Sequence, residues 1–163
     1  MVRGKLEILL VTSRDTGRWI IPKGWPMSGL PPEAAALREA WEEAGVQGRP
    51  RATCIGVYNY SKAMGPGRTI PCLVAVYPVK VAQLRDGFPE RKERRRKWFA
   101  PEKAASKVDE PELQALILGF TPTKAGRGNA ASPAATDPPP EPPEQEASGT
   151  APADTPAPLQ PGG

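Results

Sequence analysis

The sequence predicts an α+β fold in which a sheet is sandwiched between helices (an α/β/α sandwich). Three observations predict it: strand-like runs rich in aliphatic and aromatic residues, a segment with apolar residues at helical spacing, and a connection typical of a hairpin at Gly65-Pro66-Gly67. Helices and strands mixed along one chain bury their apolar faces by packing in layers. The length of 163 residues suits one domain of ordinary size.

The strands and the last helix follow from apolar patterns bounded by turn residues. Strands are predicted at residues 6–12, 19–21, 52–60, 68–81 and 98–99. The last helix should begin near Pro111, with Asp109 as its N-terminal cap and Glu112 as the capping-box partner. Its apolar face comprises Leu113, Leu116, Ile117 and Phe120.

The central helix is predicted over residues 32–44. Pro32 suits the first helical position, and Gly45 suits the position just past the C-terminal end. Apolar residues that recur at helical spacing should face the core. They are Leu37, Trp41 and Ala44.

Residues 121–163 differ in composition from residues 1–120. They hold 11 of the 22 prolines and no aromatic residue, so they cannot bury enough apolar surface to offset the entropy of folding. We predict a folded domain at 1–120 and a disordered Pro/Ala-rich tail at 121–163. The tail either recruits a partner with an aromatic groove or has no binding role.

The charge divides at the same boundary. The tail has two basic and five acidic residues, and subtracting its −3 from the chain's +4 leaves +7 on the folded part. A basic domain attracts polyanions: nucleic acid, a membrane surface or a phosphate-rich small molecule.

The composition also excludes several function classes. The sequence has no histidine, which excludes Ser-His-Asp and Cys-His catalysis and any histidine-ligated zinc site. No apolar run approaches the roughly 20 residues of a membrane-spanning helix, and no secretory signal precedes the domain. We therefore expect a cytoplasmic protein without a membrane partner. Cys54 and Cys72 are expected to be free, buried thiols.

Three glutamates of the central helix are candidate ligands for a divalent cation. Glu39, Glu42 and Glu43 are three and four positions apart, which predicts one shared helix face opposite the apolar stripe. Like charges so placed repel, and a divalent cation would remove the repulsion. Oxygen ligands favour Mg²⁺, or Mn²⁺ in its place. The same pattern also fits an ordinary solvated face, because glutamate is a good helix former.

A longer motif surrounds these glutamates. Gly24 is followed, fourteen positions later, by the run Arg38-Glu39-Ala40-Trp41-Glu42-Glu43-Ala44-Gly45-Val46. This pattern resembles the box of the Nudix hydrolase family, and the resemblance extends from Leu6 to about Phe120. It implies a mixed sheet between helices, with the box as a loop–helix–loop.

The resemblance also implies roles for the box residues. The metal ligands, which take part in catalysis, would be Glu39, Glu42 and Glu43. Structural roles would fall to Gly24, Arg38 and Gly45, with Arg38 bracing the loop–helix unit by an ion pair.

The sequence departs from the family pattern in three places. Leu30 stands where the box has its first glutamate, and Glu33 follows three residues later. Pro31 gives the helix no side-chain cap. The family's first strand, which would precede Gly4-Lys5, is expected to be missing, as from a truncated or wrongly assigned start.

Residues before and after the box indicate a branch of the family. Ser13-Arg14, residues 18–24 and residues 88–113 resemble the branch of diphosphoinositol polyphosphate and diadenosine polyphosphate hydrolases. Side chains before the box are candidates for binding several phosphates, although such charges also fit solvated turns. They are Ser13, Arg14, Arg18 and Lys23.

The expected function is Mg²⁺-dependent hydrolysis of a phosphoanhydride bond in a small polyphosphate substrate by metal-activated water. The proton acceptor would be a box glutamate or a later one, with Glu90 and Glu93 as candidates. Two alternatives remain open: a non-catalytic nucleotide- or RNA-binding module on the same scaffold, and a Nudix hydrolase acting on nucleotide sugars, ADP-ribose-like compounds or RNA caps. The basic run 91–97 would contact phosphate or RNA or form a solvated loop, and its few aromatics disfavour a single-stranded nucleic-acid platform.

Overall fold

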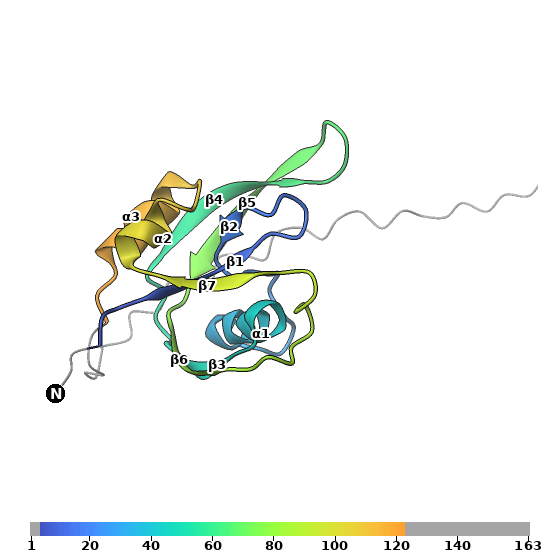
Figure 1. Ribbon diagram of the computed structural model, residues 1–163. Coiled ribbons are helices and arrows are strands. Elements are labelled where there is room, and N and C mark those ends of the chain that lie inside the picture. Colours follow the sequence, from blue (N-terminus) through green and yellow to red (C-terminus); the bar gives the residue numbers. More distant parts are fainter. Residues whose placement is uncertain (1–3, 123–163) are drawn as a thin grey trace, which may run out of the picture. The chain divides into compact units, whose positions relative to one another are not determined.

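The computed structural model describes residues 4–122 (Figure 1). Its elements in chain order are β1 (Ile8–Thr12), β2 (Trp19–Ile20), α1 (Pro32–Ala44), β3 (Val46–Pro50), β4 (Gly56–Ala63), β5 (Thr69–Val76), β6 (Val79–Leu84), β7 (Arg96–Phe99), α2 (Pro101–Ala105) and α3 (Pro111–Gly119). The predicted tail lies outside the described residues from residue 123 onward, as do residues 1–3, before which the family's first strand is expected to be missing. Within residues 4–122, every helix is too short or too polar to cross a membrane.

Strand β1 forms the centre of the fold because it is buried on both faces. Leu10 packs in one core cluster with side chains of α2 and α3, and Val11 packs in a second cluster with side chains of α1. Successive strand residues point to opposite faces, so the two helix layers cover opposite sides of β1. Figure 1 shows α2 and α3 on one side of β1 and β7, and α1 on the other. The predicted α+β sandwich is confirmed.

The strands form three small sheets in place of one mixed sheet. Their orders are β2-β1-β7, β3-β6 and β4-β5, and every strand pair within residues 4–122 is antiparallel. The strand predicted over 68–81 is divided into β5 and β6 at Tyr77-Pro78. Proline has no N–H to continue a ladder, so the chain turns there and β6 pairs with β3.

Two elements were not predicted, β3 and α2. Gly48 and Pro50 disfavour a strand, yet β3 forms because it pairs with β6 and packs against α1. Helix α2 has only five residues and no helical apolar period. It forms where Ala104 and Ala105 can be buried against the core.

Helix α1 spans the predicted residues. Pro31 precedes it without a side-chain hydrogen bond, as expected. Gly45 ends it in the left-handed conformation (φ 67°), where a Cβ would overlap the carbonyl oxygen of Arg85. The predicted core stripe is wrong at Trp41, which lies at a surface groove. The side of the helix that is buried in the core carries the small residues Ala40 and Ala44, which belong to the cluster around Val11.

Helix α3 begins at the predicted residue, but its predicted capping is wrong. The N-cap is Glu110, which makes no side-chain cap hydrogen bond. Both Glu110 and Asp109 pair with Arg18, at 2.8 and 3.4 Å, because a guanidinium binds a carboxylate more strongly than a backbone N–H does. Leu113 and Ile117 are buried, as predicted.

Candidate active site

A buried arginine joins α1 to the segment that leads into β7. Arg94 has a side chain only 7% exposed, and its Nη2 donates to Glu43 Oε1 at 2.7 Å. Its Nη1 donates to the carbonyl oxygen of Thr12 at 3.0 Å, and its Nε donates to Glu90. One guanidinium therefore holds together α1, β1 and the chain before β7.

Glu43 lies in the interior and not on an exposed helix face. It is 5% exposed, and its Oε2 faces the backbone N–H of Lys23 at 3.4 Å. Burial raises the pKa of Glu43 to about 7, against the opposing effect of Arg94. Glu43 shares a face of α1 with Glu39, as their spacing predicts, since the two carboxylates meet the adjacent residues Lys23 and Gly24. This part of the face is buried against Arg94 and is not open to solvent.

Glu39 lies against the glycine that opens the box. A Cβ at Gly24 would overlap the Glu39 carboxylate, so a larger residue there would displace this carboxylate from its position. Burial, together with repulsion from Glu42 and Glu90, raises the pKa of Glu39. The Glu39 carboxylate is thus held in a region of excess negative charge.

Glu42 and Glu90 are the two other carboxylates that contribute negative charge around Glu39. The Glu90 backbone N–H donates to the carbonyl oxygen of Glu42 at 3.0 Å, which brings the later loop onto the box. Arg38 pairs with Glu42 within α1 at 2.8 Å, so its predicted ion pair exists but does not brace the loop. We call Glu39, Glu42, Glu43 and Glu90 the acidic patch.

The acidic patch fits a hard divalent cation by its chemistry. It offers only oxygen ligands, and such an ion would relieve the repulsion that, after burial, raises the pKa of Glu39. Within residues 4–122, no three acidic or cysteine side chains converge into a ready-made metal cluster. The reason is that Glu42 and Glu43 are turned toward Arg38 and Arg94.

Three of the four predicted substrate contacts hold partners within the domain. These pairs are Ser13 Oγ with Thr16 Oγ1 at 2.6 Å, Arg14 with Glu93 at 3.3 Å, and Arg18 with Glu110 at 2.8 Å. Ser13 shapes the β1–β2 turn, and both arginines tie this turn to other segments. The structure therefore does not bring the four side chains together as one phosphate-binding group.

Lys23 is the predicted contact that reaches the acidic patch. Its backbone N–H faces Glu43, and its Nζ lies 4.3 Å from the centre of the Tyr60 ring. Burial lowers the pKa of Lys23, against the opposing effect of Glu43. A phosphate oxygen there would gain a strong electrostatic contact.

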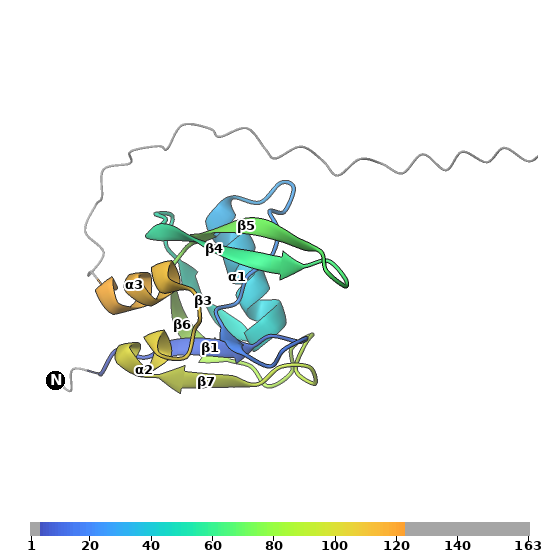
Figure 2. The same ribbon diagram turned by 90° about the horizontal axis from the view of Figure 1, so that it is seen from above.

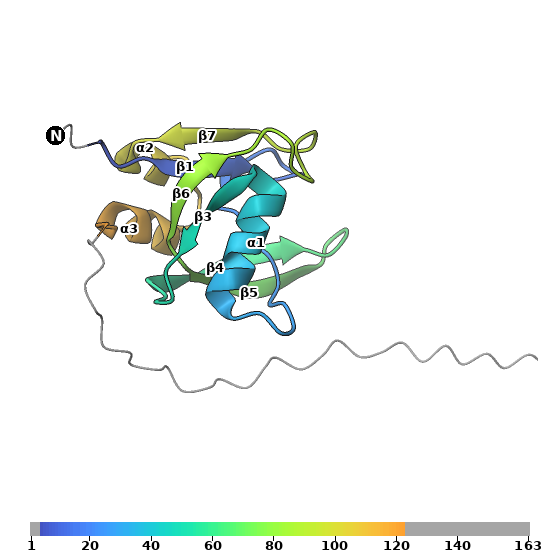
Figure 3. The same ribbon diagram turned by 90° about the horizontal axis from the view of Figure 1, so that it is seen from below.

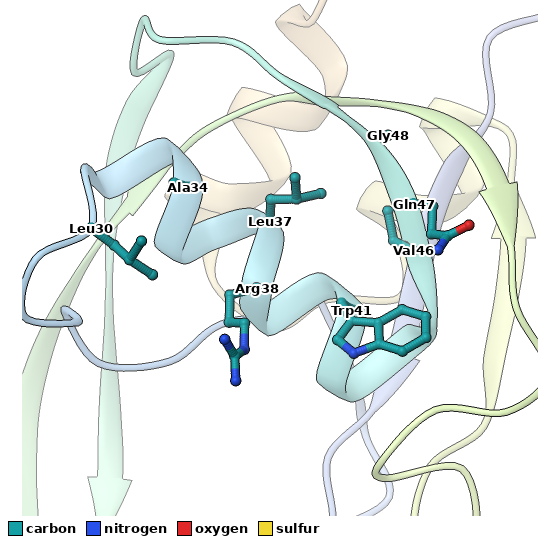
Figure 4. Close-up of a pocket in the computed structure, with 8 residues that line it drawn as sticks. All are labelled: Leu30, Ala34, Leu37, Arg38, Trp41, Val46, Gln47 and Gly48. Carbon is teal, nitrogen blue, oxygen red and sulfur yellow. The ribbon is translucent and has the colours of Figure 1, made fainter.

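A groove of about 450 Å³ lies along α1, beside β3 and the loop that precedes the helix (Figure 4). Its lining comprises Leu30, Ala34, Leu37, Arg38, Trp41, Val46, Gln47 and Gly48. Leu30, at the family's first-glutamate position, thus contributes an apolar side chain where a carboxylate would support the loop. The groove is mostly apolar, so it does not suit a multiply charged phosphate compound.

Sequence reasoning missed the role of Arg94. The basic run 91–97 was interpreted as phosphate or RNA contacts or as a solvated loop, yet Arg94 and Arg96 are internal braces. Arg96 donates to the last carbonyl oxygen of α1, that of Ala44, at 2.6 Å. The Glu90–Arg94 spacing of four was the available signal, since i,i+4 pairs of opposite charge attract.

Comparisons with known proteins identify the family of this chain. A sequence profile of the NUDIX domain matches residues 1–118. Diphosphoinositol polyphosphate phosphohydrolase 3-alpha of Mus musculus is 34% identical over 149 residues, 86% of this chain and 80% of that protein. Nudix hydrolase 12, mitochondrial, of Arabidopsis thaliana is 36% identical over 104 residues, 61% of this chain and 51% of that protein, so this chain spans about half of its length. A crystal structure of a C. elegans Ap4A hydrolase binary complex has a TM-score of 0.47 at 23% identity, covering 72% and 85% of the two chains.

The family profile and the curated relatives identify a hydrolase of the Nudix type. The chain belongs to the NUDIX family, since the profile spans most of its length and a relative 34% identical is covered over 80% of its own length. The prediction of a Nudix pyrophosphohydrolase is confirmed at the level of enzyme class.

We expect the metal-free protein to lose stability as the pH rises from about 4.5 to about 7. The pKa of Glu43 in the folded state, about 7, exceeds its ordinary value of 4.5, so the folded state binds this proton more tightly. The free energy of unfolding is then greatest below the lower value and falls through the higher one. Urea unfolding in EDTA at pH 5 and pH 8 measures this. Glu43→Gln should gain stability relative to wild type between these pH values, and a constant difference would contradict the assignment.

Proposed function

We propose that this protein hydrolyses phosphoanhydride bonds of a phosphate-rich small molecule, of diadenosine polyphosphate or inositol pyrophosphate type, with Mg²⁺ or Mn²⁺. The observation that supports this most is the acidic patch, with Glu43 and Glu90 joined by Arg94 and with Lys23 beside them. The printed names of the relatives support a phosphohydrolase.

The proposed roles follow from where each side chain lies. Glu39, Glu42 and Glu43 would hold the cation, which when bound supplies charge stabilisation and an activated water. Arg94 keeps Glu43 and Glu90 in place from the interior. Glu90 is the better-placed proton acceptor of the two candidates, since Glu93 is an exposed residue that pairs with Arg14. Lys23 binds and orients a phosphate next to the patch.

A second candidate function is a non-catalytic binding module. Two observations favour it. Leu30 stands in place of the first box glutamate, and the Glu42 and Glu43 carboxylates are both engaged in ion pairs with arginines. Such a module would bind a nucleotide or RNA and release it unchanged.

A substrate panel separates the two functions. The full chain is incubated with diadenosine tetraphosphate, an inositol pyrophosphate or a nucleotide sugar, in Mg²⁺ or in EDTA, and products are quantified. We expect turnover of at least one compound in Mg²⁺, a loss of at least about 100-fold in EDTA, and recovery in Mn²⁺. Binding without turnover across the panel, from a chain whose folding is verified, would show a binding module instead.

A further inference from the structure

A tryptophan next to the box lies in solvent under a lysine. Trp25 follows Gly24 directly and is 56% exposed. The Nζ of Lys62, from β4, lies 4.7 Å from the centre of its ring. Figures 2 and 3 both show the loop before α1 beside the β4–β5 hairpin, which explains how residues 37 positions apart meet.

A second contact between a lysine and an aromatic ring lies nearer to the acidic patch. Lys23 lies over Tyr60 at 4.3 Å, and Tyr60 is two residues from Lys62 on β4. Residues two apart in a strand share a face, and here that face is the half-buried one. The order along this surface is therefore Glu43, Lys23, Tyr60, Lys62 and Trp25. It contains two lysines and two aromatic rings that alternate.

The two lysines lie along one surface. Lys23 contacts the Tyr60 ring and Lys62 contacts the Trp25 ring, so both ammonium groups are held by aromatic rings next to the same face of β4. A chain of phosphates leaving the acidic patch would meet Lys23 and then Lys62.

We propose that Trp25 and Lys62 form a nucleoside-binding subsite of the substrate cleft, in which Trp25 stacks on a nucleobase while Lys62 and Lys23 bind the phosphates that connect it to the acidic patch. The inference rests on the proposed function and narrows its substrate to a nucleoside polyphosphate. An inositol pyrophosphate could use both lysines but has no aromatic ring to stack on Trp25. Stacking on an exposed aromatic side chain is a general means of binding nucleobases.

The test compares two substrates in one variant. Trp25→Ala should raise KM for diadenosine tetraphosphate about 10-fold or more and leave KM for an inositol pyrophosphate within about 2-fold. Trp25→Phe should restore most of the loss, because a phenyl ring still stacks. Lys62→Gln should raise KM for both compounds. Trp41→Ala, which removes an indole from the groove along α1 beside β3, is the matched control and should change neither KM.

A binding measurement tests the subsite independently of whether the protein hydrolyses the substrate. Calorimetry on the full-length Glu42→Gln, Glu43→Gln chain, with and without Trp25→Ala, gives the Kd for each compound without turnover. A loss confined to diadenosine tetraphosphate supports the subsite even if the wild type hydrolyses nothing on the panel. Equal losses for both compounds, no loss for either, or no binding of diadenosine tetraphosphate at millimolar concentration would overturn it.

Discussion

Replacing Arg94 with methionine should lower the free energy of unfolding by about 3–5 kcal/mol, because it leaves the buried Glu43 carboxylate without its cation. Glu43 and Arg94 are 5% and 7% exposed, and one guanidinium serves three acceptors on separate segments. Water cannot replace these contacts without opening the domain. The change is measured as a shift of the urea midpoint at pH 8 in EDTA.

Arg95→Met is the matched control for Arg94→Met. Arg95 is the next residue and has an exposed side chain, so its loss should cost less than about 0.5 kcal/mol. Glu43→Gln added to Arg94→Met should recover part of the stability, since the uncompensated charge is then gone. Equal effects of the two methionine variants, or no recovery in the double variant, would show that the buried ion pair does not hold these segments together.

Glu42→Gln combined with Glu43→Gln should reduce kcat/KM by at least about 10³-fold on the best substrate of the panel. Glutamine keeps the size of each side chain but removes the charge that would hold the cation, and with it the stabilisation of the transition state. Initial rates at saturating Mg²⁺ and at raised Mn²⁺ measure the loss, and circular dichroism checks the fold.

Glu102→Gln with Glu112→Gln makes the same change of charge on the exposed surfaces of α2 and α3. This control should keep wild-type turnover. A double variant of the acidic patch that retains more than about a tenth of the activity would show that these two carboxylates do not carry the reaction.

The box helix was predictable because its signals are local. Pro32, Gly45 and the intervening spacing determine where α1 begins and ends, and the structure has the same bounds. Gly24 and Glu39 were singled out as positions of one motif through the family resemblance, but their contact was not predicted. The structure shows this contact, in which the carboxylate occupies the space of a Cβ.

Other features depended on partners distant in the chain. Strand β3 exists because β6 turns back at Pro78 to pair with it, and no property of Val46–Pro50 by itself indicates a strand. Trp41 has the spacing of a core residue but lies at a groove, while the neighbouring Ala40 and Ala44 pack in the core cluster. Helical spacing specifies a face only to within a residue or two, and packing selects among those residues.

The chemical identity of the acidic patch was present in the sequence, since residue types and their spacing determine which carboxylates share a helix. Their electrostatic state was decided by tertiary structure. Only folding places Arg94 and Glu90 of the later loop beside Glu43, and only burial raises its pKa to about 7. Charge interactions depend on distance in space and on exclusion of water, and neither quantity is local in the sequence.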